Sequence, residues 1–72
     1  MKEIEAKLSL ALRYIADAEA IVGRQRERLA ELTVQGCPTQ DAKNVLDMFI
    51  GTLELLHDHA QRLREELHSS MT

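Results

Sequence analysis

Cysteine, tryptophan and long apolar runs are scarce or missing in this sequence, and each absence excludes a class of protein. The 72 residues include one cysteine, Cys37, so the chain can form no internal disulfide and no zinc site of the finger or knuckle type. No apolar stretch approaches the roughly eighteen residues of a membrane span, and the charged N-terminus lacks the apolar run of a signal peptide. We therefore expect a cytoplasmic protein with no membrane segment.

Aromatic residues and excess basic charge are also scarce. The chain has one Tyr, one Phe and no Trp, which leaves no platform on which nucleic-acid bases could stack. Its formal net charge is −3, with acidic and basic residues interspersed, whereas nucleic-acid binders usually carry a basic excess or stripe. These features predict that nucleic acid is not a partner.

Turn-forming residues gather in one segment, residues 35–39, which holds the only proline. Gly36 can adopt the positive φ that ends a helix, and Pro38 cannot continue a helix from upstream. Either Thr39 or Cys37 then stands where the N-cap of a second helix belongs. We predict a single domain over residues 1–72, with a helix over about 2–35, a turn over 35–39, a second helix over about 39–68 and a frayed tail over 69–72.

Heptad spacing organises both predicted helices. Apolar residues recur at alternating intervals of three and four, as in helices that pack lengthwise against each other. We call this set the first seam; in the first helix it comprises Ile4, Leu8, Ala11, Ile15, Ala18, Val22, Gln25, Leu29 and Leu32, and in the second Ala42, Leu46, Phe49, Leu53, Leu56, Ala60, Leu63 and Leu67. The pattern predicts an all-α fold, an antiparallel hairpin of two long helices.

A further set of mostly apolar positions runs beside the first seam. We call it the second seam; its members are Leu10, Tyr14, Ile21, Val45, Met48, Thr52, Leu55 and His59. One hairpin can bury only one seam, and a long exposed apolar stripe is either a binding surface or a liability. Chains this short also tend to need oligomerisation to become stable. We therefore predict that the second seam is the interface of a homodimer, an antiparallel four-helix bundle.

The turn fixes the register, and the register predicts contacts between polar side chains of the two helices. Lys7 should meet Glu66, and Tyr14 should meet His59. Such exposed pairs contribute at most ~1 kcal/mol each, so they select the register and hold little of the fold. Gln25 is the one polar member of the first seam. It is either a partly exposed amide near the turn or a polar contact that sets the register.

One group of residues allows a metal-binding alternative. Glu54 and His57 form a Glu-x-x-His motif on one helix face, and the register brings Glu19 opposite His57. Two copies of this set could build the di-metal site of a ferritin-like bundle. However, Glu54 lies off the first seam, and the cationic Arg26 and Arg64 share its flank. We therefore predict no metal, no cofactor, no catalytic residue and no enzymatic activity.

The segment from Ile15 to Leu67 resembles a group of short, uncharacterised proteobacterial proteins of the rhizobial type. The pattern of the group is an Ile-Ala-x-(Ala/Gly)-Glu-like start, an Arg-Gln-x-x-(Leu/Val/Ile)-x-x-Leu segment, a Gly-x-Asp-Thr-x-x-Ala turn and a Leu-rich helix that ends in a His-x-x-Arg-Leu-like segment. Here these are residues 15–19, residues 24–32, Gly36 to Ala42, and residues 59–63. Pro38 replaces the Asp that the group carries in the turn. The resemblance implies a natural bacterial helical hairpin, and it implies no activity.

Together these patterns predict a small non-enzymatic protein that acts through helix packing. The first interpretation is a homodimer formed through the second seam. The alternative is an adaptor or antitoxin-like regulator that uses the same apolar stripe to bind the helix of another protein. The sequence does not indicate the pathway.

Overall fold

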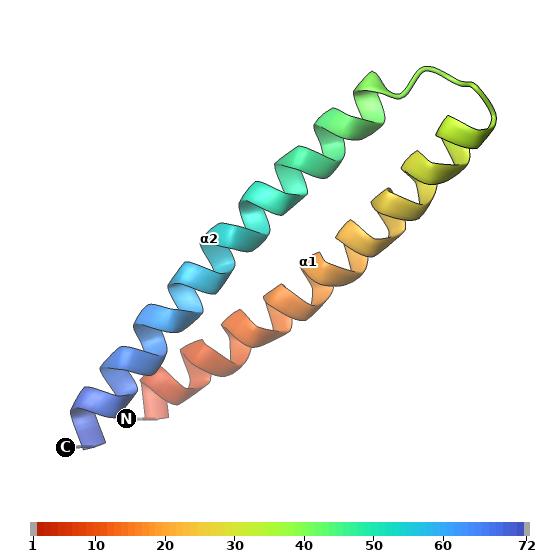
Figure 1. Ribbon diagram of the computed structural model, residues 1–72. Helices are drawn as coiled ribbons and strands as arrows, with labels where there is room; N and C mark the ends of the chain where they lie inside the picture. The colour runs from red at the N-terminus through yellow and green to blue at the C-terminus, as the bar shows by residue number, and fades with distance from the viewer. Residues whose placement is uncertain (1, 72) are drawn as a thin grey trace.

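Two long helices and one turn make up the described chain. The computed structural model describes residues 2–71, with α1 over Lys2–Val34 and α2 over Gln40–Met71. The helices lie side by side and antiparallel, so that both ends of the chain lie at the same end of the molecule (Figure 1). We call this the open end. The hairpin measures 56 × 14 × 13 Å. The predicted all-α antiparallel hairpin is confirmed.

Gly36 ends α1 with a closed backbone motif. Its φ is 72°, in the left-handed region that the backbone of a residue with a Cβ rarely adopts. The Cys37 amide donates to the Leu32 carbonyl at 2.9 Å, and the Gly36 amide donates to the Thr33 carbonyl at 3.2 Å. These two bonds are those of a Schellman motif, which satisfies carbonyls that the last helical turn leaves unpaired. Gly36 therefore has the role in the turn that the sequence predicts.

Thr39 is the N-cap of α2. Its carbonyl accepts the first helical hydrogen bond, from the Lys43 amide at 2.9 Å, while Pro38 stands just outside the helix. This geometry decides between the two predicted caps in favour of Thr39. Asp41 lies in the first turn, where its negative charge suits the helix dipole.

The predicted end of the second helix was too early. We expected residues 69–72 to fray, but α2 continues to Met71, and Thr72 lies outside the described residues. Leu67 is half-buried on the first seam and anchors the last turns, and the Ser70 hydroxyl donates to the Glu66 carbonyl at 2.9 Å. At the turn, α1 ends one residue before the predicted position 35, because Gln35 already belongs to the closing motif.

The first seam forms the contact between the helices. Among the described residues, every buried or half-buried position except Ile21, Thr39 and Ile50 belongs to it. A cluster of Ala11, Ile15, Ala60 and Leu63 forms the tightest part, with Ile4, Leu8, Leu53 and Leu56 packed against it. Ala60 is 1% exposed and Ala11 3% exposed, so two small side chains are buried between the helices in the half of the hairpin toward the open end. The predicted register agrees with this cluster.

Replacing Gly36 with alanine should lower the free energy of unfolding by about 1–2 kcal/mol, because an L side chain is strained at this left-handed φ. Gly23→Ala is the matched control. A Cβ added there meets nothing within 4 Å, and the helix-interior position favours alanine by up to about 1 kcal/mol. Urea unfolding followed by circular dichroism, at one protein concentration, compares the two. Equal stabilities for both variants would contradict the role of Gly36.

Candidate interaction surface

The second seam is largely uncovered in the hairpin. Leu55 is 71% exposed, Met48 62%, Tyr14 51%, Leu10 46% and Val45 37%. Side chains of this size normally contribute to a core, and their burial is worth about 1.5–3 kcal/mol each. The hairpin therefore leaves an apolar stripe open to solvent at the positions where the sequence predicts one.

Both helices contribute to this stripe. α1 supplies three members of the second seam and α2 supplies five, all on the same flank of the first seam. Ile21 is half-buried and joins the stripe to the core beneath it. The Thr52 hydroxyl donates to the Met48 carbonyl at 3.1 Å, within its own helix. Because that donor is already satisfied, covering Thr52 would leave no unpaired hydroxyl hydrogen.

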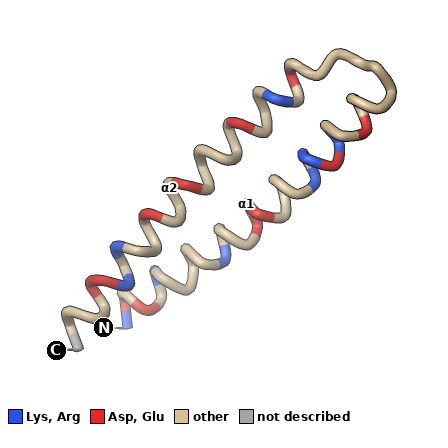
Figure 2. The backbone as a smooth tube through the Cα atoms, viewed as in Figure 1, with Lys and Arg blue, Asp and Glu red and all other residues tan. Residues whose placement is uncertain are grey.

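Charged residues of both signs occur on both helices, but between Lys43 and Arg62 α2 carries only acidic ones (Figure 2). On the flank of the second seam in α1, Asp17 and Arg24 stand on either side of Ile21. Lys7 and Glu66 lie toward the open end, and Arg28 lies toward the turn. The part of the second seam that is free of Asp, Glu, Lys and Arg therefore lies on α2, from Val45 to His59.

The predicted polar contacts between the helices do not form. Lys7 and Glu66 are both exposed and make no ion pair with each other, and no hydrogen bond joins Tyr14 to His59 in the part of the chain that the structure describes. The side-chain bonds seen there are local, such as Gln40 to Asn44 at 2.9 Å. Water competes well for exposed charges, and ordering two long side chains costs entropy, so apolar packing alone accounts for the register.

Gln25 makes no hydrogen bond that could set the register of the hairpin. Its side chain is half-buried, and no buried side-chain nitrogen or oxygen among the described residues lacks a partner. Its amide must therefore reach solvent. Of the two interpretations left open by the sequence, the structure agrees with a partly exposed amide near the turn.

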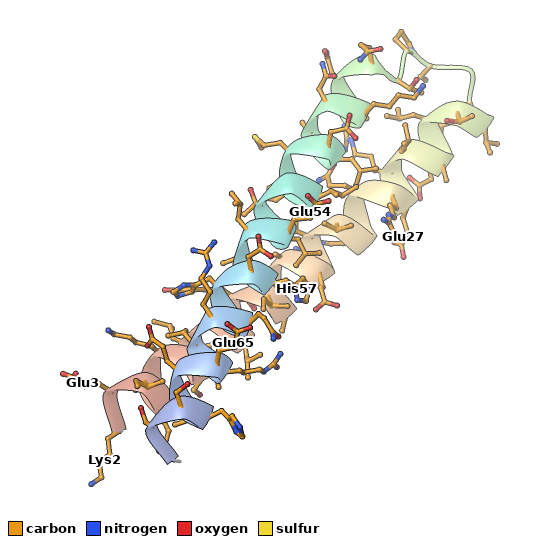
Figure 3. The ribbon with its side chains drawn as sticks, turned by 60° about the vertical axis from the view of Figure 1, so that its left-hand side comes forward. Lys2, Glu3, Glu27, Glu54, His57 and Glu65 are labelled. Carbon is orange, nitrogen blue, oxygen red and sulfur yellow. The ribbon has the colours of Figure 1, made fainter. Side chains whose placement is uncertain are left out.

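The metal-binding alternative is not assembled within one chain. Glu54 and His57 lie on α2 (Figure 3), and both are exposed, as is Glu19 on α1. Over residues 2–71, no group of three or more His, Cys, Asp or Glu side chains is close enough together to hold a metal ion. A di-metal site would therefore need ligands from a second chain.

Among the described residues, two large apolar side chains outside the second seam are also exposed. Leu12 is 40% exposed on the opposite flank, and Val34 is 86% exposed at the end of α1. Each stands apart from the stripe, and single exposed apolar residues are ordinary on protein surfaces. Leu12 and Val34 can therefore serve as control positions for substitutions in the second seam, because their side chains are also apolar and exposed but lie outside it.

Two open hollows lie on the described part of the hairpin, and one of them reaches the edge of the second seam at Leu10. One lies at the open end and is lined by Ile4, Arg62, Glu65, Glu66, Ser69 and Ser70. Another lies on α1 beside Leu10. Cys37 is exposed in the turn, and its thiol lies 3.9 Å from the Gln35 side-chain oxygen. Neither described helix is apolar over a length sufficient to span a bilayer.

The second seam is therefore the candidate functional surface of the hairpin. The resemblance to short proteobacterial hairpin proteins stays a prediction. No protein-family model matches the chain, and no curated protein or solved structure is similar enough to it to carry an argument.

Proposed function

We propose that this protein is a non-enzymatic interaction module that forms a homodimer through its second seam. The observation that carries the proposal is the exposure of Met48 and Leu55 on α2 and of Leu10 and Tyr14 on the same flank of α1. Covering these side chains removes apolar surface from water, which is the main driving force for protein association. The product is a four-helix bundle with the second seam inside it.

The dimensions of the hairpin support a second copy as the partner. A face 56 Å long and 14 Å wide is of the order of size on which an interface of ~800 Å² per partner can form. The hairpin is also thin: among the described residues, no large side chain is fully buried. A two-helix chain of this length becomes more stable when a second pair of helices packs on it. One seam alone buries little apolar area, whereas ordering the whole chain costs conformational entropy.

Sedimentation equilibrium of the purified chain tests the proposal. We expect a mass of twice 8.2 kDa at micromolar concentration, with reversible dissociation on dilution. A monomeric mass together with full helicity and a cooperative thermal transition would contradict it. That outcome would favour the adaptor or antitoxin-like interpretation, in which the stripe binds the helix of another protein.

A further inference from the structure

We infer that the contact between the two copies is centred on α2, where a large apolar side chain of one copy enters a hole beside Gly51 of the other. This inference rests on the proposed homodimer and identifies the part of the second seam that holds it together. When two helices pack lengthwise, each side chain at the contact enters a hole formed by four residues of the facing helix, at positions i, i+3, i+4 and i+7. The residues that border a hole therefore decide what it accepts.

Holes that are free of charged residues occur along the second seam of α2. Two members of the second seam that are seven residues apart enclose one hole, and α2 has three such pairs, Val45 with Thr52, Met48 with Leu55, and Thr52 with His59. No Asp, Glu, Lys or Arg borders any of these holes. The pair on α1, Tyr14 with Ile21, encloses a hole that Asp17 borders. Because covering a charge with apolar groups is costly, α2 offers the better contact.

The middle hole of α2, between Met48 and Leu55, has the smallest side chains at its sides. Gly51 and Thr52 form these sides, whereas a Met–Phe pair and a Leu–Leu pair form those of the other two holes. We call it the Gly51 hole. A Cβ added at Gly51 meets nothing within 4 Å, and the Thr52 hydroxyl already donates to the Met48 carbonyl at 3.1 Å. The Gly51 hole is therefore open, and covering it would leave no unpaired hydroxyl hydrogen.

The same stretch of α2 also supplies the side chains that such a hole accepts. Met48 is 62% exposed and Leu55 is 71% exposed, one at either end of the Gly51 hole. A symmetric dimer needs a surface that is complementary to itself. Because one stretch of α2 carries both the hole and large apolar side chains, α2 of a second copy is the occupant that fits it.

Nothing within one hairpin requires glycine at position 51. Glycine lowers the stability of a helix relative to alanine, and among the described residues only Gly36 has a positive φ. The space beside Gly51 is also empty within the chain. The missing side chain acquires a role when a second helix approaches, because a Cβ would then occupy part of the hole. A close approach of two helices is a common reason for glycine inside a helix.

The acidic residues of α2 lie beside this contact. Asp47, Glu54 and Asp58 each precede a member of the second seam by one position, which places them about 100° around the helix from it. All three are exposed. They form a polar border on the outer side of the contact, as the rim of a protein interface does.

Filling the Gly51 hole tests the inference. Gly51→Leu should weaken dimerisation at least ~10-fold in sedimentation equilibrium, because the added side chain occupies the space that the second copy needs. Gly51→Ala should weaken it by a smaller factor. Both substitutions favour the helix, so circular dichroism should show no loss of helicity.

Gly23→Leu is the matched control for this substitution. Gly23 also lies inside a helix with nothing within 4 Å of an added Cβ, but its neighbours one turn away are Glu19, Ala20, Arg26 and Glu27. It therefore borders no apolar hole of the second seam. We expect Gly23→Leu to raise helix stability in the same way and to leave the dissociation constant of the dimer unchanged.

A comparison of the two helices tests whether the contact is centred on α2. Leu10→Glu together with Tyr14→Glu, on α1, should weaken dimerisation less than Met48→Glu together with Leu55→Glu, on α2. All four side chains are exposed in the hairpin, so both pairs place carboxylates in water in the monomer. Equal weakening by the two pairs would overturn the central position of α2.

The outcomes separate this inference from the proposed homodimer. Weaker dimerisation of Gly51→Leu, with an unchanged Gly23→Leu control, supports the Gly51 hole as the seat of the contact. A leucine at position 51 also adds apolar area, so unchanged or tighter dimerisation shows that the hole is not used and leaves the homodimer standing. Equal weakening by both glycine substitutions also overturns the inference. A chain that is monomeric without any substitution overturns both the inference and the proposed function.

Discussion

A chain that carries both Met48→Glu and Leu55→Glu should sediment as a monomer while keeping its helical circular dichroism spectrum. Both side chains are more than half exposed in the hairpin, so the carboxylates remain in water as long as the chain is alone. In the proposed dimer the same carboxylates would be buried without partners. A buried charge that has no partner costs about 3–5 kcal/mol. We therefore expect the two substitutions to weaken dimerisation at least ~100-fold.

Leu12→Glu is the matched control for this pair of substitutions. It makes the same chemical change at a partly exposed apolar residue, 40% exposed, on the opposite flank. Arg13→Ala and Glu27→Ala, at exposed positions outside the second seam, serve as further controls. All three should leave the mass in solution unchanged. A Met48→Glu, Leu55→Glu chain that still dimerises would place the interface elsewhere.

The second large effect is expected in the buried cluster between the helices, where Ala60→Asp should unfold the chain or destabilise it by at least about 3 kcal/mol. Ala60 is 1% exposed and belongs to the cluster that also contains Ala11 and Ile15. Aspartate is larger than alanine and is too short to carry its charge out to solvent. Burying a carboxylate among apolar side chains is among the few single changes with effects of this size.

Ala20→Asp separates burial from helix propensity. Ala20 is exposed on α1 and, like Ala60, is followed four residues later by an arginine, Arg24 in one helix and Arg64 in the other. The two substitutions therefore share the same loss of propensity and a similar local charge pair. We expect Ala20→Asp to cost less than about 1 kcal/mol in thermal or urea unfolding. Equal losses at the two sites would mean that the first seam is not the core.

The fold was predictable from the sequence because two strong local signals agree. The heptad spacing of residues such as Ile15 and Leu63 identifies the buried side of each helix, and Gly36 marks the one place where the backbone needs a positive φ. Once the turn is placed, an antiparallel pair has few alternative registers. The cap at Thr39 was left open because both Thr39 and Cys37 stand near the helix start in sequence.

The contacts between exposed side chains and the exact end of α2 depend on small energy differences, and a sequence pattern does not show which of them is larger. The pairing of Lys7 with Glu66 was expected from the register, yet exposed charges gain too little from contact to hold a fixed geometry. The end of α2 was misplaced because serines predict fraying, whereas the packing of Leu67 extends the helix. The partner of the second seam depends on a second molecule, so the sequence and the single hairpin indicate the surface and leave its occupant as a proposal.

The central claim is that a second copy covers the second seam, and isotope-filtered NMR of a mixed dimer tests it most directly. One chain would carry labelled methyl groups and the other none, so that only contacts between chains are recorded. We predict intermolecular signals from the methyl groups of Val45, Met48 and Leu55, and none from Leu12 or Val34, which are also exposed in the hairpin. Signals confined to Leu12 and Val34, or no intermolecular signals at concentrations where the chain is fully folded, would contradict the account.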